Sequence, residues 1–458
     1  MATATATAGL SDVPATRAHP PGLWTLAATE VWDRVSFYGM QALLILYMTQ
    51  YLLLPGQTGQ VIGLGSLEAA ITAMRGPLSI EGRATQIFAL YITVMAMLPL
   101  IGGWLGDRFI SRRAGVISGA ALMTVGHVAL GFTSTFLIGL LLVLAGAGLL
   151  RGNIGPQIRA LYEAEDSRTA EAFQIYYLTV SGGGFLSPLI IGVVNERYGF
   201  HPAFAIAAVG MLIGLIWYIA RLKTLPPDPP RARRGDAGPA LSKAEKRNLV
   251  VLVCFLVVPL TFWTAQVQIW NIYNIWVSVN VDRMVGGFSV PVPWLQSFDS
   301  LAPMVMAVAA IFYWRQGKPS SETTGRMAIG CILFGAGMLI LAAAPSIAGR
   351  ETSLPILLPV AFHIVSNAGW VLFAPTCAAF FATYAPERWR GTMLGLNLLT
   401  TSVAGFLSGP LSGIYEARGP TFFWIVIALV PIAGGATLIV ASPLLRRLLT
   451  PLGPVQST

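Results

Sequence analysis

The sequence predicts an all-α membrane protein whose twelve transmembrane helices form two six-helix bundles around a central cavity. Of its 458 residues, 55% are hydrophobic and only 11% are charged, whereas a soluble protein has about 25% charged residues. The apolar residues fall in runs as long as a transmembrane helix. A polar, proline-rich segment divides these runs into two sets of six.

Twelve apolar segments are long enough to cross a bilayer as helices of about 20 residues. The net charge of +9 does not indicate a nucleic-acid-binding protein, because the basic residues lie in short loops between apolar runs. We expect the helices at about residues 22–53, 84–105, 113–132, 135–161, 170–194, 201–222, 247–276, 293–314, 325–344, 353–384, 391–415 and 421–445.

The boundary between the two sets of helices is expected at residues 223–246, KTLPPDPPRARRGDAGPALSKAEK. This segment is rich in proline and charge and cannot cross a membrane, so we interpret it as a cytoplasmic linker. The predicted organisation is a disordered N-terminal tail (1–21), an N-terminal six-helix bundle (22–222), the linker, a C-terminal six-helix bundle (247–445) and a cytoplasmic tail (446–458).

The distribution of Lys and Arg predicts that both termini are cytoplasmic, since cytoplasmic loops carry the excess of basic residues. In this orientation two of the 29 basic residues lie within helices and 21 lie in cytoplasmic tails and loops. Only six lie outside: Arg75, Arg83, Arg197, Arg283, Arg350 and Arg418.

The first expected helix carries three ionisable residues, Glu30, Asp33 and Arg34. Residues three and four apart share one helix face, so these side chains are expected to cluster. Ionisable groups are unfavourable in lipid by roughly 2.5–3.5 kcal/mol each on insertion scales and normally face a polar cavity. The cluster therefore indicates a pathway for protons or solutes.

A count of the charges expected inside the membrane predicts one exchangeable proton. The candidate anions are Glu30, Asp33 and Asp299, and the candidate cations are Arg34 and Arg151. With all five ionised the net charge is −1, which one proton neutralises. We expect Glu30 or Asp33 to hold that proton, with Arg34 completing the proton-coupling group.

The motif that contains these residues, EVWDRVSFYG at residues 30–39, resembles the ExxERFxYYG motif of the proton-dependent oligopeptide transporter family. Asp33 stands where that motif has its second glutamate. The segment GGWLGDRFISRR at residues 102–113 resembles the loop motif of the major facilitator superfamily, with Gly103, Asp107 and Arg108 as its gating residues. Its glycines allow helix ends to approach closely, and Asp107 is expected to pair with a basic group at a neighbouring helix end.

Further segments extend the resemblance to the oligopeptide transporter family over nearly the whole chain. They are GAGLLRGN (146–153), FQIYY (173–177), WLQSFD (294–299) and YAPERWRG (384–391). The resemblance implies the major facilitator fold and proton-coupled import of di- and tripeptides by alternating access. It also implies a transporter and not an enzyme, in the inner membrane of a bacterium, powered by the proton gradient without a cofactor or metal.

The expected partners are a small peptide or a related small molecule and the lipid bilayer, with no nucleic acid, and the chain is expected to act as a monomer. The sequence contains no phosphate-binding loop, paired-metal pattern or nucleophile–base arrangement.

The sequence also departs from the family at residues that the resemblance assigns to the substrate. Val267 and Trp370 align with two acids of the family, Arg151 with a lysine and Asp299 with an asparagine. A guanidinium favours bidentate contact with a carboxylate and does not release a proton, so the change at Arg151 is not conservative. These changes put ordinary dipeptide recognition in doubt.

The expected substrate-binding residues follow from the resemblance and from their chemistry. Arg34 and Arg151 are candidates for clamping a carboxylate, because guanidinium contacts are strong and directional. Asp299 is the candidate for a cationic amine. We interpret His127 and His363 as structural histidines and not as a proton relay. The other expected cavity residues are Tyr38, Gln41, Tyr91, Asn153, Tyr177, Trp370 and Asn397.

Three functions remain open from the sequence. The first is a proton-coupled peptide symporter. The second is a proton-coupled transporter of a modified amino acid or another organic anion, which the missing acids suggest. The third is a membrane sensor that binds a ligand without transporting it.

Overall fold

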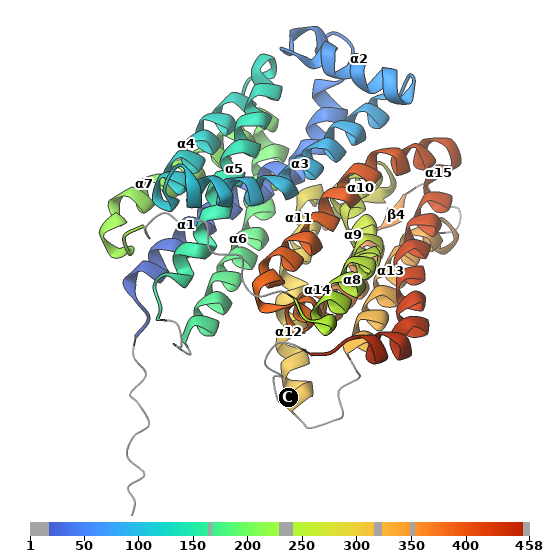
Figure 1. The fold of residues 1–458 in the computed structure, drawn as a ribbon. Helices are drawn as coiled ribbons and strands as arrows, with labels where there is room; N and C mark the ends of the chain where they lie inside the picture. Colours follow the sequence, from blue (N-terminus) through green and yellow to red (C-terminus); the bar gives the residue numbers. More distant parts are fainter. Residues whose placement is uncertain are drawn as a thin grey trace, which may run out of the picture.

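The computed structural model describes residues 18–163, 166, 168–228, 241–315, 323–348 and 353–451. Figure 1 shows two groups of helices, one built by the blue-to-green half of the chain and the other by the yellow-to-red half. The nearly all-helical class expected from the sequence is confirmed.

The first group contains α1 to α7. Their bounds are α1 (Pro21–Tyr47), α2 (Leu64–Arg75), α3 (Ile80–Arg108), α4 (Arg112–Leu130), α5 (Phe136–Arg159), α6 (Arg168–Tyr198) and α7 (Phe200–Ala220). A π-helical turn, Met48–Leu52, continues α1. Arg83 of α3 holds the short helix α2 through an ion pair of 2.5 Å to Glu68.

The second group contains α8 to α15. Their bounds are α8 (Lys243–Phe255), α9 (Val257–Trp270), α10 (Ile272–Asn280), α11 (Val292–Gln296), α12 (Phe298–Arg315), α13 (Thr323–Ala348), α14 (Leu357–Tyr384) and α15 (Arg390–Leu448). Four two-residue strands lie in its loops: β1 (Val281–Asp282), β2 (Met284–Val285), β3 (Phe288–Ser289) and β4 (Leu354–Pro355). β1 pairs with β4 in parallel and β2 with β3 antiparallel.

Several predicted helices are interrupted in the structure. The helix expected at 247–276 consists of α8, α9 and α10, with a break in helical geometry at Asn271 (φ −106°, ψ −101°). The helix expected at 293–314 is divided at Ser297 between α11 and α12. The helices expected at 391–415 and 421–445 both lie in α15, which non-helical geometry at Gly419 (φ +80°, ψ 170°) divides into two helices. A positive φ is adopted readily only by glycine, so this residue permits the break.

Among the described residues, nine helical segments are long and apolar enough to cross a membrane. α1, which carries Glu30, Asp33 and Arg34, is not among the nine. Many large apolar side chains are exposed on the outside of the helices, including Val440, which is 82% exposed. An apolar exterior of this extent is expected of a protein surrounded by lipid.

Glycines allow α3 and α5 to pack at close range. A Cβ atom at Gly102 would overlap the carbonyl oxygen of Gly148, and one at Gly103 would lie 3.0 Å from the carbonyl oxygen of Gly152. A Cβ atom at Gly106 would overlap the side chain of Asn153. Small residues that let backbones approach are the usual means of packing helices in membranes.

The loop after α3 is fixed by an ion pair and by hydrogen bonds to the start of the linker. Asp107 lies 2.9 Å from Nε of Arg112 at the start of α4, as the sequence predicted for a basic group at a neighbouring helix end. Oδ1 of Asp228 accepts hydrogen bonds from the backbone nitrogens of Arg112 (3.1 Å) and Arg113 (3.4 Å). A carboxylate at a helix N-terminus satisfies free backbone donors.

Much of the predicted linker and most of the predicted tails lie outside the described residues. The described part of the linker includes the last two residues of a short 3-10 turn, Leu222–Thr224, and the start of α8 at Lys243. The domain boundaries proposed from the sequence therefore stay a prediction.

Hydrogen bonds join the two groups of helices at the end of the molecule that carries α2. The hydroxyls of Thr85 (α3) and Ser412 (α15) are 2.8 Å apart, and the hydroxyl of Ser79 donates to Oε1 of Glu416 at 2.6 Å. An ion pair of 3.0 Å joins Arg283, in the loop after α10, to Glu196 of α6. These contacts close the two groups together at this end.

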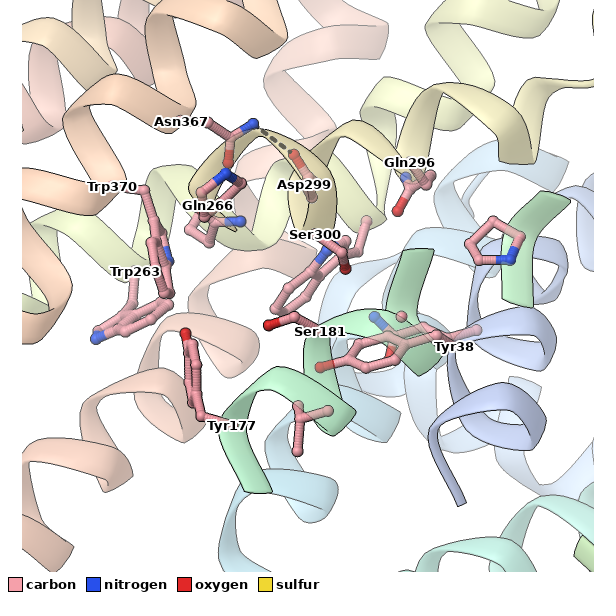
Figure 2. A pocket seen from close by; sticks show the side chains of 16 residues that line it. Tyr38, Tyr177, Ser181, Trp263, Gln266, Gln296, Asp299, Ser300, Asn367 and Trp370 are labelled. Carbon is pink, nitrogen blue, oxygen red and sulfur yellow. Dashed lines mark hydrogen bonds between the residues drawn. The ribbon is translucent and has the colours of Figure 1, made fainter. Parts of the chain in front are cut away.

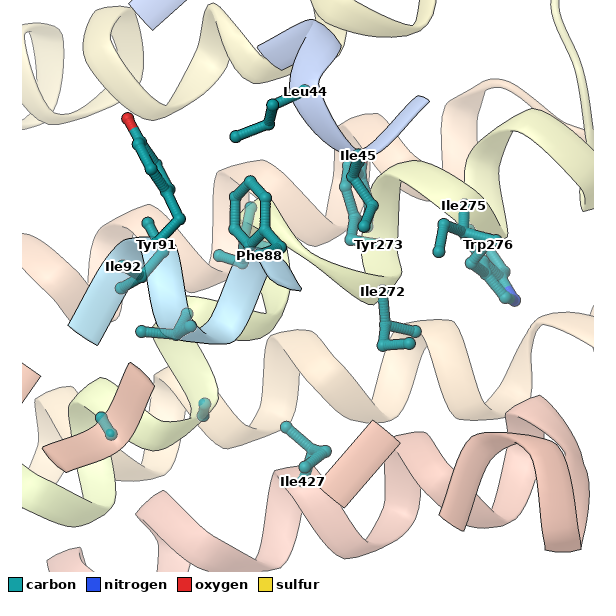
Figure 3. Packing of buried hydrophobic residues seen from close by; sticks show 14 of the residues in the cluster. Leu44, Ile45, Phe88, Tyr91, Ile92, Ile272, Tyr273, Ile275, Trp276 and Ile427 are labelled. Carbon is teal, nitrogen blue, oxygen red and sulfur yellow. The ribbon is translucent and has the colours of Figure 1, made fainter. Parts of the chain in front are cut away.

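Apolar side chains also pack between the two groups of helices at this end of the molecule. Figure 3 shows Leu44 and Ile45 of α1 near Phe88 of α3 and Tyr273 of α10, with Ile427 of α15 on the other side. These residues belong to one buried cluster that extends across both groups of helices. Since α1, α3, α10 and α15 meet here, separation of the groups at this end would expose apolar as well as polar surface.

Replacement of Gly102 by alanine is predicted to destabilise the protein, because the new methyl group would overlap the backbone of α5. Overpacking of this kind costs about 1–3 kcal/mol. The measurement is the thermal unfolding midpoint of the purified protein in detergent. Gly155→Ala on α5 is the control, since a Cβ atom there has no neighbour within 4 Å. Equal midpoints for the two variants would contradict the proposed close packing.

Candidate functional site

Four charged side chains form a buried cluster between α1 and α5. Nε and Nη2 of Arg34 donate to Oε1 of Glu30 at 2.8 and 2.5 Å. Arg151 of α5 donates to both carboxylate oxygens of Asp33, at 3.0 Å from Nε and 3.3 Å from Nη2. Nε of Arg34 also lies 3.6 Å from Oδ2 of Asp33. Two carboxylates and two guanidiniums thus share one site.

The cluster satisfies the conditions for holding charge inside a helical bundle. The side chains of Glu30 and Asp33 are fully buried, while those of Arg34 and Arg151 are 13% and 10% exposed. Buried ions are tolerated when paired and hydrogen-bonded, and the cluster is neutral when all four groups are ionised. Because Arg34 contacts only Oε1 of Glu30, the buried Oε2 is not engaged by a guanidinium.

Aromatic rings cover the two guanidiniums. The Arg151 guanidinium carbon lies 3.8 Å from the centre of the Phe37 ring, and that of Arg34 lies 5.8 Å from the Tyr38 ring. A guanidinium over a ring face gains electrostatic attraction from the ring quadrupole. Phe37 and Tyr38 come one turn after Asp33 and Arg34 on α1, so the helix supplies both the charges and their cover.

A cavity of about 220 Å³ lies between the two groups of helices, with Tyr38 linking it to the charge cluster. Figure 2 shows Tyr38 and Tyr177 from the first group facing Trp263, Trp370 and Asp299 from the second. Tyr177 is 54% exposed although it lines the cavity, so the cavity is open to the surroundings. Its lining residues are Tyr38, Gln41, Tyr177, Val180, Ser181, Gly184, Pro188, Trp263, Gln266, Trp270, Gln296, Asp299, Ser300, Pro303, Asn367 and Trp370.

A second polar group stands on the far side of this cavity. Oδ1 of Asp299 lies 2.9 Å from Nδ1 of His363 and accepts a hydrogen bond of 3.2 Å from Asn367. Nε2 of His363 lies 2.8 Å from the Tyr273 hydroxyl. Oδ2 of Asp299 is buried and has no hydrogen-bond partner among the described residues. A carboxylate accepts several hydrogen bonds, so Asp299 retains capacity for a donor.

The structure places the sequence-predicted residues in three groups. Five line the cavity: Tyr38, Gln41, Tyr177, Asp299 and Trp370. Glu30, Asp33, Arg34 and Arg151 form the adjoining charge cluster.

The remaining candidates lie outside the cavity lining. Asn153 faces α3, donating to the carbonyl oxygens of Gly102 (3.0 Å) and Leu149 (2.8 Å). Tyr91 is buried against Phe37, and Asn397 accepts a contact of 3.5 Å from the Cys377 thiol.

The loop-motif residues Gly103, Asp107 and Arg108 are also remote from the cavity, at the end of α3. His127, interpreted as structural, is fully buried, and neither ring nitrogen has a hydrogen-bond partner among the described residues.

Sequence reasoning missed several cavity residues, and for three of them a signal was present. Trp263, Gln266 and Trp270 all line the cavity from α9. Their spacing of three and four residues places them on one helix face, and a face that combines tryptophan with glutamine is unusual for contact with lipid. Gln296, Ser300 and Asn367 gave no comparable signal, because each depends on how its helix is rotated in the bundle.

Two groups of apolar helices that enclose a polar cavity, with paired charges at its base, define a multi-pass membrane transporter of the major facilitator type. The comparisons with known proteins agree with this class. A family model described as the POT family matches residues 113–230 and 239–425. The chain belongs to the POT family.

Similar proteins cover nearly all of the chain. An uncharacterized transporter, YclF, of Bacillus subtilis (strain 168) is 27% identical over 94% of this chain and 95% of its own length. A di-/tripeptide transporter of Lactococcus lactis subsp. cremoris is 25% identical over 93% of this chain and 96% of its own.

Solved structures show the same fold. A peptide transporter POT in complex with sulfate has a TM-score of 0.82 at 22% identity, covering 95% of this chain and 97% of that one. A POT family transporter in complex with 5-aminolevulinic acid has a TM-score of 0.80 at 22% identity, covering 94% and 97%. These matches confirm the major facilitator fold predicted from the sequence.

Removal of Arg151 is predicted to destabilise the protein strongly, because Arg151→Gln leaves Asp33 buried without its bidentate partner. Breaking a buried pair costs about 3–5 kcal/mol. The double variant Asp33→Asn/Arg151→Gln removes both charges and is expected to recover most of this loss. Unfolding midpoints in detergent provide the measurement.

The control is Arg112→Gln, which breaks the pair with the 49%-exposed Asp107 side chain. An exposed pair contributes about 0–1 kcal/mol, so this variant should change the midpoint little. If Arg151→Gln lowered the unfolding midpoint no more than Arg112→Gln does, the buried pair of Arg151 and Asp33 would not stabilise the protein as predicted.

Proposed function

We propose that this protein is a proton-coupled symporter that imports di- and tripeptides by alternating access. It acts as a monomer in the inner membrane of a bacterium, with both termini cytoplasmic and the proton gradient as its energy source. It is a transporter and not an enzyme, and it uses no metal or organic cofactor. The observation that carries the proposal is one cavity with arginines beside its base and a carboxylate on its opposite wall.

The relatives support peptides as the substrate class. Two similar proteins are named as a di-/tripeptide transporter and as the peptide transporter YePEPT of Yersinia enterocolitica. A small peptide carries a carboxylate and an ammonium group, which match the guanidiniums of the cluster and Asp299. The walls between these groups are aromatic, formed by Tyr177, Trp263 and Trp370, and suit apolar side chains of varied size.

The alternatives receive less support. An organic anion without an amine would leave Asp299 without a cationic substrate group. A non-transporting sensor finds no support among the relatives, whose names describe transporters.

Proton coupling is proposed to operate through Glu30. A substrate carboxylate that binds Arg34 competes with Glu30 for the same guanidinium donors. Once displaced, Glu30 is a buried carboxylate without its ion pair, and desolvation then favours its protonated form. Substrate and proton therefore bind together, which is the requirement for symport.

The contacts at the α2 end of the molecule support a conformation that is closed on one side. With the proposed orientation this is the outer side. Import then requires the pair of Arg283 with Glu196 and the contact of Thr85 with Ser412 to separate while the opposite end closes. Each of these contacts contributes only a small stabilising free energy, as is usual for exposed ion pairs and for hydrogen bonds between hydroxyls. The closed end can therefore reopen during transport.

Uptake of radiolabelled dialanine into proteoliposomes with an acidic exterior is predicted to exceed uptake without a proton gradient. Glu30→Gln should abolish this stimulation, because the amide does not bind the coupling proton. It should retain exchange of labelled for unlabelled dialanine, which needs no net proton movement. Glu81→Gln, at an exposed position on α3, is the control and should behave as the wild type.

Two results would contradict these proposals separately. Absence of dialanine uptake and exchange by the wild type would overturn peptide transport. Full gradient-driven uptake by the Glu30 variant would overturn the coupling scheme while leaving peptide transport intact.

Replacement of Asp299 by asparagine is predicted to weaken dialanine binding by about tenfold, equivalent to ~1.4 kcal/mol. A hydrogen bond to a charged group contributes about 1.5–3 kcal/mol, part of which the asparagine oxygen retains. N-acetyl-dialanine lacks the cationic amine and should bind wild type and variant equally. Quenching of tryptophan fluorescence in detergent measures the affinities, since Trp263, Trp270 and Trp370 line the cavity. An equal loss for both ligands would show that Asp299 does not recognise the amine.

A further inference from the structure

Two glutamines on the cavity wall carry amide oxygens that the protein itself does not use. Gln41 of α1 and Gln266 of α9 are 3% and 5% exposed, and both line the cavity. Oε1 of each is buried and has no hydrogen-bond partner among the described residues. An unpaired buried polar atom is unfavourable and uncommon in folded proteins, so each of these amides requires an explanation.

A third glutamine shows how such an amide is used for packing. Gln296 also lines the cavity, and its Nε2 donates to the carbonyl oxygen of Ile269 at 2.8 Å and to Oδ1 of Asn274 at 2.7 Å. These bonds join α11 to α9 and α10. In the part of the chain that the structure describes, the amide oxygens of Gln41 and Gln266 have no comparable partner. Packing of helices therefore does not explain them.

The two glutamines come from different groups of helices. Gln41 follows Arg34 by seven residues and Tyr38 by three, so the three side chains share one face of α1. Gln266 belongs to α9 in the second group, and Figure 2 shows it on the cavity wall that also carries Asp299. Each group thus presents one unpaired amide oxygen beside the charged residue proposed to hold one end of the substrate.

A carboxamide is the chemical complement of a peptide bond. It has an acceptor oxygen and a donor –NH₂, while a peptide group has one N–H donor and one carbonyl acceptor. The last torsion of a glutamine side chain is soft and roughly two-fold, so each amide can turn either its oxygen or its nitrogen toward the cavity. In the proposed function Arg34 and Asp299 hold the charged ends of a dipeptide. The polar group that remains between those ends is its peptide bond.

We propose that Gln41 and Gln266 recognise the peptide bond of the substrate, one accepting from its N–H and the other donating to its carbonyl oxygen. This inference rests on the proposed function, since it assumes a peptide held by its two ends. It adds a third point of recognition, which separates a dipeptide from a molecule that carries the same charged ends on another linkage. A site that hydrogen-bonds a substrate N–H discriminates against an analogue that lacks it, because the polar groups of the site then stay unpaired.

The test compares dialanine with alanyl-lactate, an ester analogue in which oxygen replaces the peptide N–H and both charged ends are retained. Tryptophan fluorescence of the purified full-length protein in detergent measures the two affinities. The wild type is expected to bind dialanine about tenfold more tightly than the ester, equivalent to ~1.4 kcal/mol. The ester has no N–H donor, and its carbonyl is a weaker acceptor than that of an amide.

Methionine is the replacement for each glutamine, because it has a similar length and no amide. In the double variant Gln41→Met/Gln266→Met the ratio of the two affinities is expected to fall to about one, and each single variant should lose part of the preference. General damage to the cavity weakens both ligands alike and does not change the ratio. Gln174→Met is the control and should keep the wild-type ratio, since Gln174 is exposed on α6 and does not line the cavity.

Unfolding midpoints of the ligand-free variants test whether the two amides lack structural partners. Gln41→Met and Gln266→Met remove an unpaired polar group, so the midpoint is expected to stay the same or rise. Gln296→Met breaks two hydrogen bonds and is expected to lower it. If all three variants lowered the midpoint equally, the amides of Gln41 and Gln266 would have structural partners and the proposal would be overturned.

The binding results separate this proposal from peptide transport itself. If the double variant keeps the wild-type ratio, or if the wild type binds dialanine and alanyl-lactate equally, the glutamines do not recognise the peptide bond, and peptide transport still stands. If the wild type neither binds nor transports dialanine, peptide transport fails, and recognition of the peptide bond fails with it.

Discussion

The pairing of charges buried among apolar helices is the constraint on which the rest of this structure depends. A lone ion inside the bundle would be too unfavourable to retain, so each buried carboxylate determines which residue must face it. Asp33 requires a guanidinium from α5, and Arg151 supplies it at 3.0 Å. Asp299 is paired with an imidazole from α14, at 2.9 Å. These pairs tie helices together at the place where the cavity forms.

The same pairs give the cavity its two chemically different ends. The arginines at one end can exchange a protein carboxylate for one brought by a substrate, since both make the same charge-assisted hydrogen bonds. The carboxylate of Asp299 is at the other end, beside the imidazole of His363. In the exchange at the arginines the buried charge stays balanced, so binding there does not leave an unpaired ion in the interior. Each group of helices contributes one end of the cavity.

Close helix packing supports this arrangement from outside the cavity. Gly102 and Gly148 bring α3 and α5, the helix that carries Arg151, into backbone contact. Asn153, expected in the cavity, instead bonds to the backbone of α3 at this interface. Its polarity serves the packing of helices, as is common for amides in membrane bundles.

The sequence by itself determined the helical class, the approximate helix positions and the existence of a charged cluster on α1. These depend on local properties: hydrophobic run length and the three- and four-residue spacing of a helix face. Only the tertiary structure decided which groups pair between helices. The face of α14 that carries His363 meets Asp299 because of how two helices are rotated against each other, and no local pattern encodes that rotation. His363 is an isolated histidine in the sequence. The packing of α14 against α12 places it beside the carboxylate of Asp299.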